Sequence, residues 1–412
     1  MTINGSSDGV EPLTPTRVVP PAEKRTDHHE SPIDYYYARF GTFMLAGTLA
    51  AIKEVGEGED LLNKLVIALE GDSRVVTVGS AVHRKDWMHT RTIYPRINQG
   101  IEGDILGSQN RLAAVSLSDP LSFTVNVPIK NQPRFRGCED VPTDTYHVAW
   151  DGITAVVIWE IQRDDNNVPR SGGHVIVDIL KDASEKIGLD LVAQACSPGC
   201  TNIFTHKILR IERFGGKGIF YTEAIDDLHI KAHIHATGDA LQVAINFLKS
   251  IKFTGEVFAI FKNSSRHILD IEKFCRELVD DLLGLNYSVI QWKRLSIRAR
   301  IKGWKIHRSQ RRQMQNIIAI LWLVLADVEA LRRDWLQNRR TLLNSLAKPL
   351  NEHLYDRDRS DDDDSVMSQD LSFIRAAIEQ AAVRSDTRMV AIATIYGALG
   401  GMVGGLIGGL LS

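Results

Sequence analysis

Runs of β-branched and aromatic residues, separated by Gly, Pro, Asn and Asp, dominate the chain between residues 74 and 161. This pattern predicts β-strands, because such side chains pack well on a pleated, half-buried surface. The run Ile153–Ile161 is almost wholly apolar, as expected of a strand that is covered on both faces. The predicted strands are Arg74–Ser80, Arg111–Ser118, Phe123–Lys130, Tyr146–Trp150 and Ile153–Ile161.

Helical patterns flank these strands and predict helices over Pro32–Glu54, Asp60–Glu70 and Gly173–Ile187. An apolar strand, Leu189–Ala195, follows the last helix and completes a β-α-β unit with Ile153–Ile161. The usual right-handed crossover would make those two strands parallel neighbours. Three further predicted strands complete a mixed α+β domain over residues 34–236, namely Ile203–Ile211, Gly218–Thr222 and His229–His235.

From Asp239 onward the pattern is helical, and helices are expected over Asp239–Ile251 and Ser264–Leu283. Between residues 317 and 345, steps of four and three place mostly apolar residues on one seam, with the charges off it. A helical bundle or coiled-coil stalk is therefore predicted over residues 237–350. The seam consists of Ile317, Leu321, Val324, Val328, Leu331, Trp335, Asn338, Leu342 and Ser345.

The last 24 residues, Met389–Ser412, contain no charged side chain. As a helix they would be roughly 36 Å long, enough for a hydrocarbon core of about 30 Å. Arg384 and Arg388 precede them, as expected of a cytoplasmic flank. The sequence therefore predicts one C-terminal transmembrane helix, with the N-terminal bulk of the chain facing the cytoplasm. The alternatives are a Gly-rich apolar tail and a buried helix of a soluble core.

Glycines recur every four residues in this segment, in two interleaved registers. Small residues at this spacing let helix backbones approach closely in lipid, where packing drives association. The pattern predicts a glycine-zipper helix, a homo-oligomer and a pore; the alternative is a membrane anchor without a partner. The glycines are Gly397, Gly400, Gly401, Gly404, Gly405, Gly408 and Gly409.

The remaining segments are predicted from composition. Residues 1–33 are polar and proline-bearing and predict a disordered arm. Residues 351–368 are rich in aspartate and predict an acidic linker, and residues 369–388 predict an amphipathic helix. The predicted fold class is α+β: an N-terminal mixed sheet domain with helices, then a helical bundle or coiled-coil stalk and one C-terminal transmembrane helix.

Composition excludes several classes of protein. The 412 residues are 44% hydrophobic and 24% charged, which excludes a wholly disordered chain. The 49 basic and 51 acidic residues leave a net charge of −2, so the chain as a whole is not a basic, polyanion-binding protein. Four cysteines are too few for a disulfide scaffold, which favours a reducing compartment.

The charge is nevertheless uneven, because no acidic residue occurs from Leu282 to Ala326. In a membrane-anchored protein such a segment predicts contact with anionic lipid headgroups. Nucleic acid is the second interpretation, since the same charges would neutralise phosphates. The alternatives are an anionic small molecule and a solvated helix face paired with the aspartates of the acidic linker. The cations are Lys293, Arg294, Arg298, Arg300, Lys302, Lys305, Arg308, Arg311 and Arg312.

Two groups of side chains are candidate metal ligands. Cys196 and Cys200 flank a turn, with His206 six residues on, and thiolate and imidazole are zinc-type ligands. Buried structural cysteines are the alternative. His229, His233 and His235 share one face of a strand, where a half-exposed row of histidines is the alternative to a metal site.

No Ser-His-Asp order, paired-carboxylate motif or H-E-x-x-H motif occurs, so the sequence identifies no catalytic residue and no cofactor. The favoured function is assembly at a membrane, with a zipper helix and a pore controlled by the α+β domain. One alternative is a membrane-tethered enzyme or metal-binding domain for which the tail is only an anchor. Another is a sensor of anionic lipid or nucleic acid that acts through the basic segment.

Overall fold

A computed structural model describes most of the chain after residue 34. Residues 1–34 and 383–412 lie outside the described part, so the predicted disordered arm and the Gly-rich transmembrane helix are not described. The described residues are 35–56, 58–79, 90–97, 112–132, 143–160, 172–194, 196, 202–213, 221–227, 229–234 and 239–382.

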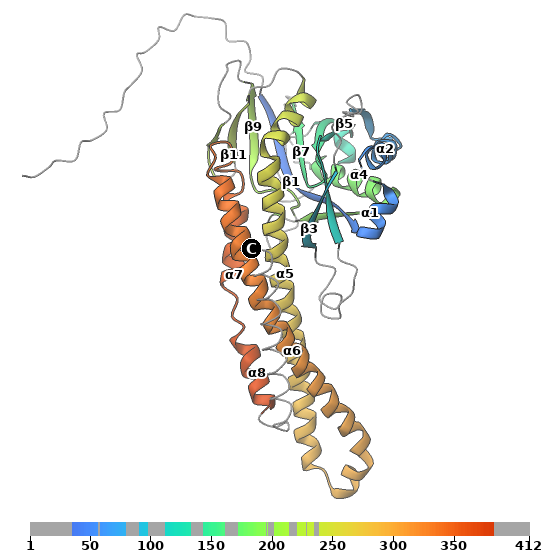
Figure 1. The fold of residues 1–412 in the computed structure, drawn as a ribbon, viewed down its shortest axis with the longest axis vertical. Helices are drawn as coiled ribbons and strands as arrows, with labels where there is room; N and C mark the ends of the chain where they lie inside the picture. The colour runs from blue at the N-terminus through green and yellow to red at the C-terminus, as the bar shows by residue number, and fades with distance from the viewer. Residues whose placement is uncertain are drawn as a thin grey trace, which may run out of the picture. The chain divides into compact units, whose positions relative to one another are not determined.

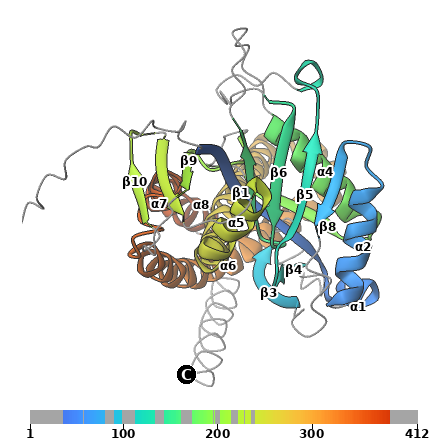
Figure 2. The same ribbon diagram turned by 90° about the horizontal axis from the view of Figure 1, so that it is seen from above.

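Within the described residues, eleven strands form one mixed sheet (Figures 1 and 2), which confirms the α+β class. The order is β10-β11-β9-β1-β7-β6-β5-β2, with β4 and β8 also paired to β1, and β3 paired to β4. The strands are β1 (Tyr35–Thr48), β2 (Val75–Gly79), β3 (Thr90–Ile97), β4 (Leu112–Leu117), β5 (Leu121–Asn126), β6 (Thr145–Trp150), β7 (Thr154–Trp159), β8 (Asp190–Gln194), β9 (Ile208–Arg213), β10 (Tyr221–Ala224) and β11 (His229–Ile234).

Helices cover both faces of this sheet. On one face, α1, α2 and α4 pack on side chains such as Val157 and Trp159; on the other, α5 packs on Val156 and Ile158. Strand β7 is therefore buried on both faces, as its apolar sequence predicts. The helices are α1 (Leu49–Val55), α2 (Glu59–Glu70), the short 3-10 helix η2 (Ile129–Asn131), α4 (Gly172–Lys186), α5 (Ala240–Arg294), α6 (Ile297–Leu346), α7 (Asp356–Met367) and α8 (Ser372–Ala382).

The helix predicted over Pro32–Glu54 is wrong for most of its length, because β1 occupies Tyr35–Thr48 and only α1 is helical. Strand β1 is central: β9 and β8 pair along one edge, and β7 and then β4 along the other. A strand enclosed in this way is apolar on both faces and loses the alternation that marks strands in sequence. Glycines weaken a helix by about 1 kcal/mol each relative to alanine. In the strand, Gly41 leaves room for the carbonyl oxygen of Ile203, which a Cβ would approach to 2.7 Å.

The β-α-β unit is only partly as predicted. Strands β7 and β8 are each antiparallel to β1 and hence parallel to one another, joined through α4. They are not neighbours, however, because β1 lies between them in the sheet. A strand from another part of the chain fills the gap, which local sequence does not indicate.

Strand β3 was not predicted. It contains Pro95, which cannot donate a ladder hydrogen bond and argues against a strand. The structure accommodates this proline at an irregularity, since the register of β3 against β4 shifts between Ile93 and Ile97.

Helix α5 is continuous over 55 residues, where the sequence predicted two separate helices. Its first part packs on the sheet, and Gly255 lies directly against Thr154 of β7. A Cβ at residue 255 would collide with the Thr154 hydroxyl, so glycine sets the close approach of helix and sheet.

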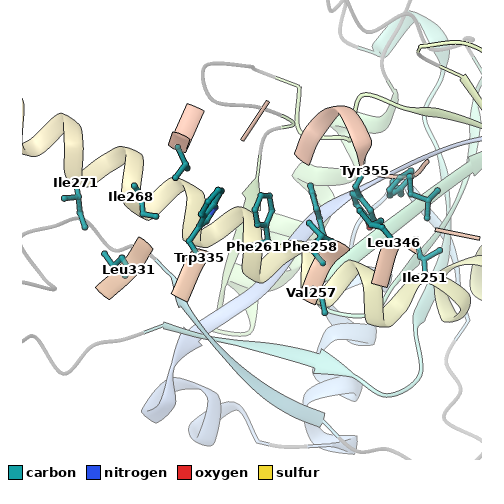
Figure 3. Packing of buried hydrophobic residues seen from close by; sticks show 14 of the residues in the cluster. Ile251, Val257, Phe258, Phe261, Ile268, Ile271, Leu331, Trp335, Leu346 and Tyr355 are labelled. Atoms are coloured by element: carbon teal, nitrogen blue, oxygen red, sulfur yellow. The ribbon is translucent and has the colours of Figure 1, made fainter. Parts of the chain in front are cut away.

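The rest of α5 pairs with α6 in an antiparallel helical hairpin (Figure 1). Eight of the nine predicted seam residues of α6 are buried, and Asn338 is half-buried. Figure 3 shows Leu331, Trp335 and Leu346 facing Ile268, Phe261 and other apolar side chains of α5. The Trp335 indole N–H donates to Ser265 Oγ over 2.9 Å.

Residues 356–367, within the predicted acidic linker, form helix α7. Three of its aspartates, Asp358, Asp362 and Asp363, are buried. A run of aspartates indicates solvent exposure from composition alone. Here each of the three has a basic partner on another element or on α7 itself, which permits burial.

Candidate functional site

The turn between α5 and α6 carries the basic segment identified in the sequence. Helix α5 ends at Arg294, Leu295 and Ser296 are extended, and α6 begins at Ile297. About 30 helical residues, or about 47 Å, separate Asn263 near the sheet from Arg294. We call residues 292–312 the hairpin tip.

Aromatic stacking closes the hairpin tip. The Trp292 ring lies on the His307 ring, with centroids 3.8 Å apart and planes within 6°. Gly303 lies against this stack, since a Cβ there would be 3.4 Å from Trp292 Nε1, an ordinary van der Waals contact. Arg308 lies over the Trp304 ring at 5.5 Å, a cation–π geometry. The tip is therefore an ordered surface.

That surface presents both cations and apolar side chains to solvent. Ile297 is 76% exposed and Trp304 is 53% exposed, with Leu295 and Ile306 also exposed. Large apolar side chains gathered among cations are typical of membrane-surface elements. The side chains of Lys293, Arg300 and Lys302 are not described. The described and exposed cations are Arg294, Arg298, Lys305, Arg308, Arg311 and Arg312.

The aspartates of α7 do not neutralise the tip. Among the described residues, Asp358 and Asp361 pair with His206, Asp362 with Lys262, and Asp363 with Arg339 and Arg359, and no ion pair joins α7 to the tip. A solvated basic face paired with the acidic segment is therefore not what the described contacts show.

Helix α8 runs toward the tip. Gln369 contacts the Ile268 carbonyl, whereas Phe373 lies under Arg276, farther along α5. The contacts with α6 show the same direction. Arg332 of α6 donates to the Gln369 carbonyl, and Arg375, later in the chain, pairs with Glu329, which is nearer the tip than Arg332. Helix α8 is thus parallel to α5 (Figure 1).

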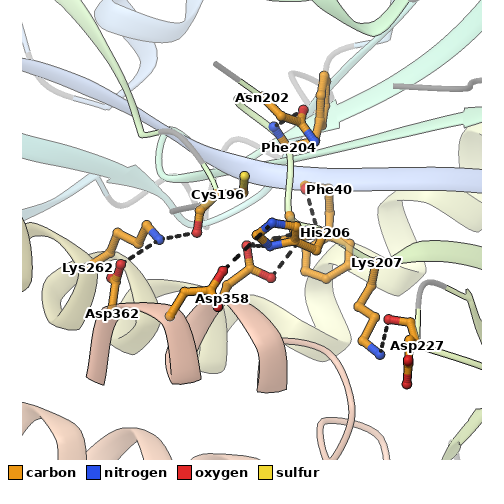
Figure 4. Close-up of polar contacts among 12 residues, drawn as sticks. Phe40, Cys196, Asn202, Phe204, His206, Lys207, Asp227, Lys262, Asp358 and Asp362 are labelled. Atoms are coloured by element: carbon orange, nitrogen blue, oxygen red, sulfur yellow. Dashed lines mark hydrogen bonds and ion pairs between the residues drawn. The ribbon is translucent and has the colours of Figure 1, made fainter. Parts of the chain in front are cut away.

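Only part of the predicted metal-ligand set is brought together. In the described chain, Cys196 and His206 approach each other and are joined by Asp358 of α7, with all donor atoms within 4.8 Å. Figure 4 shows His206 above α7 at Asp358, with Lys262 and Asp362 alongside. Cys200 lies outside the described residues. Local sequence does not indicate Asp358 as a ligand, because its neighbour His206 is 152 residues away in the chain and Cys196 is farther still.

A buried ion pair adjoins this cluster. Lys262 is 1% exposed, and its Nζ donates to Asp362 Oδ1 over 3.1 Å and also to the Cys196 carbonyl. Burial raises the pKa of Asp362 to about 6, although Lys262 opposes the shift. The carboxylate is thus mostly ionised only above that pH.

His229 and His233, the two described histidines of the row on β11, do not share one site. His229 pairs with Asp226, whereas His233 stacks on Tyr221 at 4.2 Å and lies 3.7 Å from Glu212 and from Glu223. Four residues along a strand separate two side chains by about 13 Å, too far to share one ion. His235 lies outside the described residues.

The zipper glycines also lie outside the described residues. Among those described, one helix is long and apolar enough to cross a membrane, the part of α6 from Gly303 to Leu346, which is consistent with a single-pass membrane protein. Its most apolar window is 44% buried, however, and the buried seam faces α5. A core helix of a soluble protein has the same properties.

Fold and site together define an α+β protein whose sheet carries a long helical hairpin with a cationic, partly apolar tip. No protein-family model, curated protein or solved structure matches this chain. Its function must therefore be inferred from its own residues and geometry.

Proposed function

We propose that this is a membrane-attached protein whose hairpin tip binds an anionic lipid surface beside the point where residues 389–412 enter the bilayer. The observation that carries the proposal is the joint exposure of cations and large apolar side chains at the tip. Cations near an anionic surface contribute about 1 kcal/mol each. Exposed Ile297 and Trp304 would gain further free energy on leaving water.

The direction of α8 supports the same arrangement. Phe373 lies beside Arg276, so Ala382, nine residues later, comes level with about residue 285 of α5. Arg294 is then about 14 Å farther along the axis. The seven residues from Ala382 to Met389 can span at most roughly 24 Å. The apolar tail is therefore within reach of the plane that the tip would occupy.

Binding to anionic vesicles tests the role of the tip. Each cation removed should cost about 1 kcal/mol, so four glutamine substitutions are expected to cost about 4 kcal/mol and weaken binding by roughly several hundredfold. Binding should also fall as salt rises, because the interactions are screened. The measurement is cosedimentation of a chain ending at Arg388 with phosphatidylserine-containing vesicles and with neutral vesicles. The substitutions are Arg298→Gln, Lys305→Gln, Arg311→Gln and Arg312→Gln.

A matched variant removes four exposed cations from other surfaces and should bind as the parent does. If both variants lose the same amount of vesicle affinity, the cations of the tip act only through the net charge of the protein, and the tip is not the binding surface. Tighter binding to single- or double-stranded nucleic acid than to any vesicle would replace lipid with nucleic acid as the partner. The matched substitutions are Lys53→Gln, Lys130→Gln, Lys181→Gln and Arg357→Gln.

We further propose that the tail self-associates through its glycine registers and that the assembled helices form a pore controlled by the α+β domain. Seven glycines would make an isolated helix costly, which close packing between helices offsets. The spacing of the glycines supports this part.

Exchanging Gly401 and Gly405 for isoleucine should reduce crosslinked oligomers and any ion conductance while membrane insertion persists. Isoleucine adds bulk where backbones would touch, yet it increases the hydrophobicity of the span. Crosslinking of the full chain in membranes measures the outcome. Leu406→Ile with Leu410→Ile, on the opposite helix face, is the control. Unchanged oligomers in the glycine variant would leave the tail as an anchor only.

A further inference from the structure

Three donor atoms from three separate segments meet where α7 packs on the sheet. Cys196 lies two residues after β8, His206 two residues before β9, and Asp358 in the first turn of α7. Their sulfur, nitrogen and oxygen atoms lie within 4.8 Å of one another. Thiolate, imidazole and carboxylate together are the donor types that bind Zn²⁺ in proteins.

Two buried carboxylates of α7, those of Asp358 and Asp362, lie at this point. Asp358 is fully buried, and within the described residues its partners are the backbone N–H and the Nδ1 of His206. Lys262 balances the neighbouring Asp362, whose Oδ2 has no hydrogen-bond partner. Burying a carboxylate costs free energy, and a cation bound directly to Asp358 would offset part of that cost.

The orientation of His206 suits a metal ligand. Its Nδ1 lies 3.2 Å from Asp358 Oδ1, close to the separation of about 3.3–3.5 Å between two ligands on one tetrahedral zinc ion. Its Nε2 faces Asp361 Oδ2 at 3.8 Å, on the more exposed side. Metal-binding histidines commonly direct the second nitrogen toward a carboxylate, which fixes the ring. A side-chain shift of about 1 Å would bring the Cys196 sulfur to bonding distance from an ion held by His206 and Asp358.

We propose that Cys196, His206 and Asp358 bind a divalent transition metal of the zinc class, with water as the fourth ligand and Asp361 orienting the His206 ring through Nε2. The ion joins the ends of β8 and β9 to α7. Metal binding therefore strengthens the attachment of α7 to the sheet.

Cobalt is a suitable probe, because thiolate-to-cobalt charge transfer gives an absorption band that reports a Co–S bond. Full-length reduced protein in detergent is expected to bind one Co²⁺ per chain with such a band, and Zn²⁺ should displace it. The band should be lost in Cys196→Ser and in Asp358→Asn. The control is Cys275→Ser, which removes another buried thiol, in α5, and should leave the band intact.

Zinc should also raise the thermal unfolding midpoint of the parent and of Cys275→Ser, but not of Cys196→Ser. Absence of a band in the parent, or its persistence in Cys196→Ser, would overturn the proposal and leave a His206–Asp358 ion pair. Where a ligand variant fails to fold, Asp361→Asn provides the test. A tenfold weaker affinity for Co²⁺ supports the site, and an unchanged affinity contradicts it.

Discussion

Replacing Asp362 by alanine is expected to destabilise the fold by about 3–5 kcal/mol above pH 7, because it leaves the Lys262 ammonium buried and unpaired. Lys262 is 1% exposed and has the Asp362 carboxylate as its charged partner at 3.1 Å. Urea unfolding of a chain ending at Arg388 measures the change in the free energy of unfolding.

Two further variants show whether the cost arises from the unpaired charge. Lys262→Met combined with Asp362→Leu removes both charges and should recover part of the loss, ending about 1–3 kcal/mol below the parent, because the Cys196 carbonyl loses its donor. Glu185→Ala breaks the exposed pair with Lys181 and should change stability by less than about 1 kcal/mol. A small effect of Asp362→Ala would mean that water reaches Lys262.

Trp335→Ala is expected to cost about 3–5 kcal/mol, the usual range for truncating a large buried aromatic side chain. The indole packs 5.8 Å from the Phe261 ring, centroid to centroid, and donates to Ser265, so the change opens a cavity between α5 and α6. The same unfolding measurement applies. Truncation of the adjacent Leu336, which is 40% exposed, should cost less than about 1 kcal/mol. Equal losses at the two positions would contradict the packing of the hairpin.

The sequence predicts those elements whose neighbours are close in the chain or whose periodicity is strong. The seam of α6, the doubly buried β7 and the helices α2 and α4 are of this kind. Strand β1 is not, since its strand character depends on partners more than 100 residues away in β7 and β8. Strand β3 is likewise not predictable from local sequence. Pro95 argues against a strand, and the irregularity that accommodates this proline arises only in the pairing with β4.

The candidate sites divide in the same way. Charge counting locates the basic segment, but the exposure of Ile297 and Trp304 follows only from the geometry of the hairpin. Thiol and imidazole chemistry identifies Cys196 and His206. Asp358 is not apparent from its aspartate-rich surroundings, because tertiary packing buries it although composition suggests solvent.

Because α5 is one continuous helix of 55 residues, a change in its direction at the sheet would be carried to the tip. Its first part packs on β7 where Gly255 meets Thr154, and its other end is the tip, about 47 Å beyond Asn263, which contacts Gln194 of β8. A tilt of only about 5° at the sheet displaces the far end of such a 47 Å arm by about 4 Å. A small change in packing around β7 that tilted α5 in this way would therefore displace the tip by about the diameter of a side chain.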